Sequence, residues 1–149
     1  MVTQNELIEN YKRDFNEKTG ENIKVLVVSK WESLANFDKS PVNFWKVCKM
    51  VFDFTGWKKS NTFTKSRNAE RVARRGLIDF LAVNNGCSLI GVGRATDRDH
   101  TTIIHSVNKF DIMLDSDMYT RKILIETMDF IRENYHFYKD KDIRPEDVQ

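Results

Sequence analysis

The sequence predicts an all-α protein, and three observations lead to this prediction. Apolar residues recur three or four positions apart through most of the chain, which is the spacing of one helix face. Short polar breaks, several of them containing glycine or proline, separate these periodic segments. The β-branched run at residues 23–28 has no second run nearby with which to pair, and a lone strand would leave its edges unpaired. We therefore expect irregular or helical structure there.

The periodic segments predict the helices in chain order. The expected helices cover residues 4–18, 29–37, 41–56, 69–84, 88–95, 98 to the polar break at 115–117, and 118–138. Gly20 and Gly56 are expected to end two of them, and Pro41 suits a first turn. Ser29 begins a capping-box sequence, and Ser88 is expected to cap its helix.

One face of each helix is expected to be buried. The residues expected on the buried faces are Phe44, Val47, Cys48, Val51, Phe52, Val72, Leu77, Phe80, Leu81, Val83, Ile103, Ile104, Val107, Phe110, Leu124, Met128, Ile131 and Tyr135. Residues 57–68 are expected to form a basic loop. The charged tail from Lys139, which contains Pro145, is expected to fray.

Length and composition fit one domain with a modest extension. The chain has 149 residues, of which 40% are hydrophobic, and no apolar run of 18 residues that would span a membrane. The first residues lack the pattern of a signal peptide, and the two cysteines, Cys48 and Cys87, favour reduced thiols over a disulfide. We therefore expect a cytoplasmic protein. It divides into an extension at 1–40, either a cover over the core or a docking surface, a main domain at 41–138 and a charged tail at 139–149.

Positive charge is concentrated in one block. Residues 58–75 contain seven basic residues and one acidic residue, a net charge of +6. Because the whole chain carries +2, the rest of it carries −4. A basic block on a slightly acidic body is typical of proteins with a polyanion partner, and a merely solvated helix face is the alternative.

A cluster of polar residues opens the helix that follows the turn at Thr96–Asp97. In helix-turn-helix proteins, the first residues of the second helix touch base edges in the major groove. Threonine offers a hydroxyl and a methyl group that suits thymine, aspartate can accept from cytosine, and histidine can donate to a base or phosphate. Capping alone would not explain these residue types together. The predicted base-recognition residues are therefore Arg98, Asp99, His100, Thr101 and Thr102.

The same stretch carries a family resemblance. Arg98-Asp-His-Thr-Thr-Ile-Ile-His105 resembles the signature of the DNA-binding domain of the bacterial replication initiator DnaA. Ser88-Leu89 and Val92-Gly93-Arg94-Ala95 resemble the first helix of that family's helix-turn-helix, and the similarity runs over roughly residues 41–133. At 96–97 this chain has Thr-Asp where the family has a large apolar residue and a glycine.

The resemblance also implies roles for residues upstream of the turn. Lys65-Ser-Arg67 resembles the family's basic loop, and Val72-Ala-Arg-Arg75 resembles the start of its long helix. It implies that Arg67, or Lys65 as the alternative, enters a minor groove. It implies phosphate contacts by Arg74, Arg75, Ser88 and Ile90.

The function that the resemblance implies is sequence-specific binding of double-stranded DNA at a site like the initiator's box. The expected role is replication-origin binding or control of replication initiation, near the nucleoid, with replication proteins or a host initiator as further partners. A short version of this kind suits a phage or another mobile element. A transcription regulator using the same helices remains an alternative, as does an interaction or structural protein that has kept the fold without DNA binding.

Enzyme chemistry is not expected. His100 and His105 are five residues apart and do not share a helix face, and no CxxC or HxxxH spacing exists for a metal. No serine or cysteine stands in a nucleophile motif. A GxxxxGK[ST] phosphate loop is absent, so we expect neither a cofactor nor ATPase activity.

Overall fold

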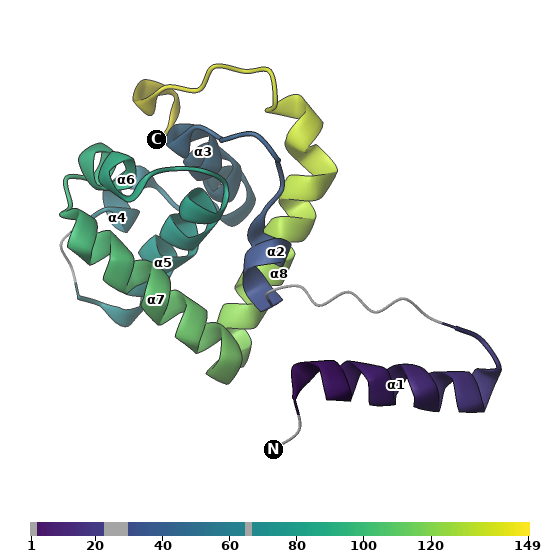
Figure 1. Cartoon of the computed structure of the whole chain (residues 1–149). Coiled ribbons are helices and arrows are strands. Elements are labelled where there is room, and N and C mark those ends of the chain that lie inside the picture. The colour runs from purple at the N-terminus through teal and green to yellow at the C-terminus, as the bar shows by residue number, and fades with distance from the viewer. Residues whose placement is uncertain (1–2, 23–29, 65–66) are drawn as a thin grey trace.

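The computed structural model describes residues 3–22, 30–64 and 67–149. Within these residues the chain forms eight α-helices, two short 3-10 helices and no strand, so the prediction of an all-α protein is confirmed (Figure 1). The helices are α1 (Gln4–Thr19), α2 (Lys30–Ala35), α3 (Phe44–Thr55), α4 (Lys59–Thr62), α5 (Ala69–Asn84), α6 (Leu89–Thr96), α7 (His100–Ser116), α8 (Met118–Asn134), η1 (Tyr135–Phe137) and η2 (Pro145–Asp147). The predictions for residues 23–28, Ser29 and Lys65 fall outside the described residues.

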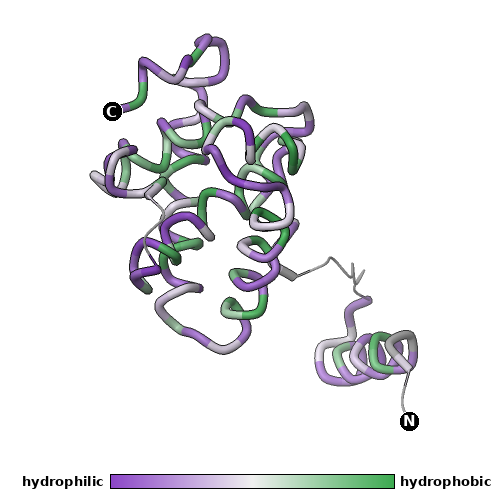
Figure 2. Tube along the Cα trace, turned by 90° about the vertical axis from the view of Figure 1, so that its left-hand side faces the viewer, coloured by the Kyte–Doolittle hydropathy of each residue, from purple (hydrophilic) through white to green (hydrophobic). Residues whose placement is uncertain are grey.

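Helix α5 lies at the centre of the bundle. It packs against α7, α3, α2, α4 and α6, while α8 closes the other side against α3, α7 and α2. Hydrophobic and hydrophilic residues alternate along the trace of the bundle (Figure 2). The largest fully buried side chains are Phe80, Met50, Leu77, Ile78, Leu81, Ile103, Leu114, Leu124, Met128, Ile131, Val47 and Val51. Helix α1 lies apart from the bundle in both views, with Leu7 and Tyr11 exposed (Figures 1 and 2).

Polar caps and glycines set the helix ends. Thr3 and Glu6 form a capping box at the start of α1. The helix ends at Gly20, as predicted, and this glycine adopts the left-handed conformation. Gly56 ends α3 in the same way. The expectation that Pro41 lies in the first turn of α3 is wrong, because Asn43 caps this helix by accepting from two backbone N–H groups.

The segment 57–68 is not wholly a loop, contrary to the prediction, because α4 occupies four of its residues. The hydroxyl of Thr62 is buried and donates to the carbonyl oxygen of Lys58, which closes this single turn. The backbone N–H of Lys59 donates to the carbonyl oxygen of Gln149, at the other end of the chain. A hydrogen bond to so distant a residue cannot be predicted from the local sequence.

The C-terminal tail does not fray, which corrects the prediction for it. Ile143 and Val148 are buried in the core, and Pro145 begins the short helix η2. The ammonium group of Lys59 donates to the carbonyl oxygen of Pro145 at 2.9 Å. The alternating charges of this tail suggested a solvated segment. Its two buried apolar residues find apolar neighbours only in the folded chain.

The turn between α6 and α7 is tight. Ser88 caps α6, as predicted, and Asp97 ends that helix at φ 53° and ψ 47°, in the left-handed region. The N–H of Arg98 donates to the carbonyl oxygen of Gly93 at 2.8 Å. A Cβ on Gly93 would lie 2.4 Å from the carbonyl oxygen of Arg98, so this position requires glycine.

The buried faces follow the predicted pattern with a few differences. Ile104 is 36% exposed rather than inward. Val72, Val83 and Val107 are half-buried because they lie at the edges of their helix faces. Tyr135 follows the end of α8, in η1. No helix in the described part of the chain has both the length and the apolar character of a membrane span.

The turn makes a test of stability possible with two glycine variants. Alanine is favoured over glycine within a helix by about 1 kcal/mol, so a loss on substitution reports a clash. We expect Gly93→Ala to destabilise the fold by about 1–3 kcal/mol, because its Cβ meets a backbone oxygen. Gly76→Ala is the comparison variant: its Cβ would meet the buried ring of Phe110 at 3.1 Å rather than a backbone oxygen, so we expect a smaller loss. Denaturant unfolding measures both. A Gly93→Ala variant as stable as wild type would contradict the tight turn.

Candidate nucleic-acid interface

The first turn of α7 presents a row of polar side chains to solvent. The side chains of Asp99 and His100 are 67% and 57% exposed, and Thr101 and Thr102 are exposed as well. These four residues lie at the N-terminal end of a 17-residue helix, where the aligned backbone dipoles give a partial positive charge. The structure therefore brings four of the five predicted base-recognition residues together on one accessible helix end.

Asp99 is also the N-cap of α7. Its carboxylate accepts a 2.7 Å hydrogen bond from the backbone N–H of Thr101, and bonds from Thr101 lower the pKa of Asp99. This cap is lost only as the pH falls through that lowered pKa, so it is intact at neutral pH. The Nδ1 atom of His100 lies 3.5 Å from the same carboxylate. Thr96 does not take part in this cap, because its hydroxyl donates to the carbonyl oxygen of Val92.

Arg98 is placed differently from its four neighbours. Its side chain is only 13% exposed and its guanidinium forms a bidentate pair with the buried carboxylate of Asp79, at 2.8 and 2.7 Å. The Nε atom donates to the hydroxyl of Thr96 at 2.9 Å. The side chain thus turns toward the protein, and the structure does not bring it onto the accessible row.

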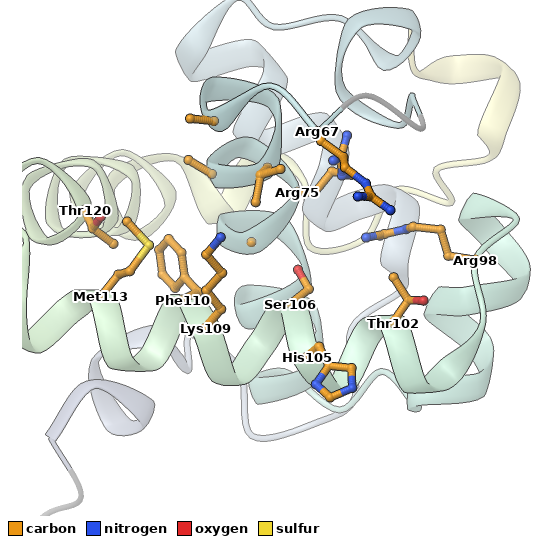
Figure 3. A pocket seen from close by; sticks show the side chains of 14 residues that line it. Arg67, Arg75, Arg98, Thr102, His105, Ser106, Lys109, Phe110, Met113 and Thr120 are labelled. Atoms are coloured by element: carbon orange, nitrogen blue, oxygen red, sulfur yellow. The ribbon is translucent and has the colours of Figure 1, made fainter.

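A cleft of about 410 Å³ runs between the start of α5 and the face of α7, beside the polar row (Figure 3). Its lining includes the small or apolar residues Ala69, Val72, Ala73, Gly76, Phe110 and Met113. Its exposed polar rim carries Arg67, Thr102, His105 and Lys109, and the half-buried Arg75 and Arg98 also line it. Figure 3 shows Arg67, Arg75 and Arg98 gathered at the end of the cleft nearest the start of α7. The cleft therefore joins the basic block to the polar row.

The predicted phosphate contacts on α5 are partly occupied by the protein. Arg75 donates to the carbonyl oxygens of Thr62 and Thr64, and burial, followed by the positive charge of Arg98, lowers its pKa. Arg74 pairs with Glu70 at 2.6 Å and lies over the ring of Trp57. Arg75 reaches the cleft, whereas Arg74 does not line it.

Two other predicted positions lie at the start of α6. Ser88 is exposed and its hydroxyl caps the helix by accepting from Gly91. Ile90 is 56% exposed and lines a second hollow together with Asp99 and His100. The start of α6 and the start of α7 therefore share one surface.

Sequence reasoning missed two residues of this surface. His105 and Lys109 are exposed and line the cleft on the same face of α7 as Thr102. His105 follows Thr102 by three residues, and Lys109 follows His105 by four, so all three lie on one helix face. This spacing was visible in the sequence. The prediction stopped at the first turn.

The cysteines are poor candidates for chemistry. Cys48 and Cys87 are free, and burial raises the pKa of both thiols, that of Cys87 to about 11. A thiol with so high a pKa is protonated and unreactive at neutral pH. No group of three or more potential metal ligands occurs in residues 3–22, 30–64 and 67–149.

Comparisons of the chain with protein-family models, with curated proteins and with solved structures found no match.

Proposed function

We propose that this protein binds double-stranded DNA with sequence preference, using α6 and α7 as a helix-turn-helix of the DnaA type. One observation carries the proposal. Asp99, His100, Thr101 and Thr102 stand exposed on the first turn of α7, beside a cleft with a basic rim. An α-helix with side chains is about 10–12 Å across, which matches a major groove about 12 Å wide.

Base reading falls to these four exposed residues. The hydroxyl and methyl groups of Thr101 and Thr102 suit a thymine or a neighbouring donor, and the carboxylate of Asp99 suits cytosine N4. His100 donates to a base or a phosphate. Because the side chain of Arg98 is bound within the protein, we leave it out of the base-reading set.

Backbone contacts come from the basic rim and from the start of α6. Lys109 and Arg75 reach phosphates from the cleft, and Ser88 and Ile90 offer backbone N–H groups at a helix N-terminus, which attracts anions. Arg67 is exposed and enters a neighbouring minor groove, with Lys65 as the alternative. Arg74, held by Glu70 and Trp57, is a weaker contact than the sequence suggested.

The biological role that this proposal supports best is binding at a replication origin, or control of replication initiation, without ATP hydrolysis. The resemblance of residues 98–105 to the initiator's signature supports a site like the initiator's box. Selection of bound sequences from a random duplex pool tests the proposal directly. We expect one short motif to be enriched. A failure to retain any duplex at low salt would remove DNA binding altogether.

The first prediction from this proposal concerns specificity. Thr101→Ala should weaken binding to the selected site by about 1–3 kcal/mol and relax the choice at one base pair. Binding to random duplex should barely change. Thr19→Ala, at the end of α1, is the matched control and should change neither. Equal losses on selected and random duplex would mean that Thr101 does not read a base.

The second prediction concerns the phosphate contacts. Lys109→Ala should weaken binding to all duplexes and reduce the slope of log K against log salt by about 1, because one phosphate contact is lost. Lys122→Ala is the control, since this exposed lysine lies on α8 and pairs with Glu126. Titrations at several salt concentrations measure the slope. If both variants share the wild-type slope, the cleft is not part of the interface.

The third prediction concerns Arg67. A narrow minor groove concentrates negative potential, so a planar guanidinium gains most where A·T pairs flank the site. Lysine is a more strongly hydrated point charge and should replace it poorly. We expect wild type to prefer sites with A·T flanks and Arg67→Lys to lose most of this preference while keeping the choice at the core bases. An unchanged flank preference would point to Lys65 instead.

A further inference from the structure

The contact between Arg98 and Asp79 contains more hydrogen bonds than an ordinary ion pair. Asp79 lies in the middle of α5 with no exposed side-chain surface. Both of its oxygens accept from the guanidinium of Arg98, and one also accepts from the hydroxyl of Ser106 on α7 at 2.6 Å. The carboxylate therefore joins three segments: α5, the turn before α7, and α7 itself.

The other atoms of Arg98 are held as well. Its Nε donates to Thr96, whose own hydroxyl is fixed by the backbone of α6. Its guanidinium lies over the ring of Phe63, 5.9 Å from the ring centre, just after α4. Its N–H donates to the carbonyl oxygen of Gly93. Arg98 thus contacts α6 through Thr96 and Gly93. It also contacts Phe63, which lies between α4 and Arg67.

Such a pair constrains geometry more than it adds stability. Desolvating two charges is costly, so a buried pair stabilises a fold weakly compared with well-packed apolar residues of similar size. Removing one partner is different, because it leaves an unpaired charge in the interior. The bidentate fork also admits only a narrow range of angles between guanidinium and carboxylate.

We propose that Arg98 is a positioning residue rather than a DNA contact: through Asp79 it sets the orientation of the first turn of α7, and thereby the sequence preference. The proposal rests on the proposed DNA-binding function of that turn. Base reading tolerates little error, because recognition groups must be held within about 0.5 Å of their productive geometry. A loosened pair therefore affects the choice of sequence before it affects general attraction to DNA.

Two variants that conserve net charge distinguish positioning of the first turn of α7 from direct contact of Arg98 with DNA. Arg98→Lys keeps the positive charge but loses the fork and the bond from Nε. The double variant Asp79→Leu with Arg98→Met replaces the pair by apolar side chains and removes one charge of each sign. Both leave the long-range attraction to DNA unchanged, so differences in binding report local geometry or direct contact.

The DNA measurement compares affinity for the selected site and for random duplex over a range of salt. We expect both variants to lose roughly tenfold or more of the ratio between the two affinities, with the salt slope unchanged. A slope reduced by about 1 in the double variant, with equal loss on both duplexes, would make Arg98 a phosphate contact and overturn the proposal. An unchanged ratio in both variants would overturn it too.

The second measurement needs no DNA. In the free protein, hydrogen exchange at the amides of Thr101 and Ile103, both bonded to Asp99, should quicken in Arg98→Lys. The amide of Val47, at the start of α3, should keep its rate and controls for global unfolding. Unchanged exchange at Thr101 and Ile103 would overturn the positioning role. If wild type binds no duplex at all, the proposed function fails, while this arm still decides whether Arg98 orders the turn.

The single variant Arg98→Met tests the proposal through stability, in case a variant is too unstable for DNA binding to be measured. It leaves Asp79 unpaired, and we expect its melting temperature to fall by roughly 10 °C. Adding Asp79→Leu should recover most of that loss. A double variant no more stable than Arg98→Met would mean that the buried carboxylate was not the cause, and would count against the proposal.

Discussion

The Asp79 carboxylate is fully buried, and three hydrogen bonds from outside its own helix satisfy it. An ionised group without water must find such donors, or its burial costs several kcal/mol. Both donors, Arg98 and Ser106, belong to the segment that carries the exposed polar row. The need to satisfy one carboxylate in α5 therefore sets where the turn lies and how α7 leaves it. The rest of the candidate interface depends on that placement.

The side chains at the turn between α6 and α7 form a polar network around this pair. The hydroxyl of Thr96 links the backbone of α6 to the Nε of Arg98. Asp97 adopts φ 53°, a conformation that glycine takes more easily and that aspartate also tolerates. Gly93 leaves room for the carbonyl oxygen of Arg98. Hydrogen bonds from polar side chains thus hold this corner.

The basic block has two roles in the folded chain. Lys59, Arg71, Arg74 and Arg75 bind carbonyl oxygens, hydroxyls, a carboxylate or aromatic rings within the protein. Arg67 stays exposed at the rim of the cleft, across from residues of α7. Net charge alone therefore overstates how many cations a polyanion would meet. Under the proposed function, the summed charge of the block would still attract DNA toward the face where the polar row lies, because long-range attraction depends on the sum of charges.

The sequence by itself determined the all-α class, most helix bounds and the polar row at 99–102, because helical period and capping are local chemistry. Only the tertiary structure decided that Arg98 turns inward, since its partner Asp79 lies 19 residues away. The same holds for the tail, whose Ile143 and Val148 find a core only after folding. Local patterns report which faces are apolar. They do not indicate which distant group pairs with a buried charge or which core an apolar side chain joins, because those partners meet only in the folded chain.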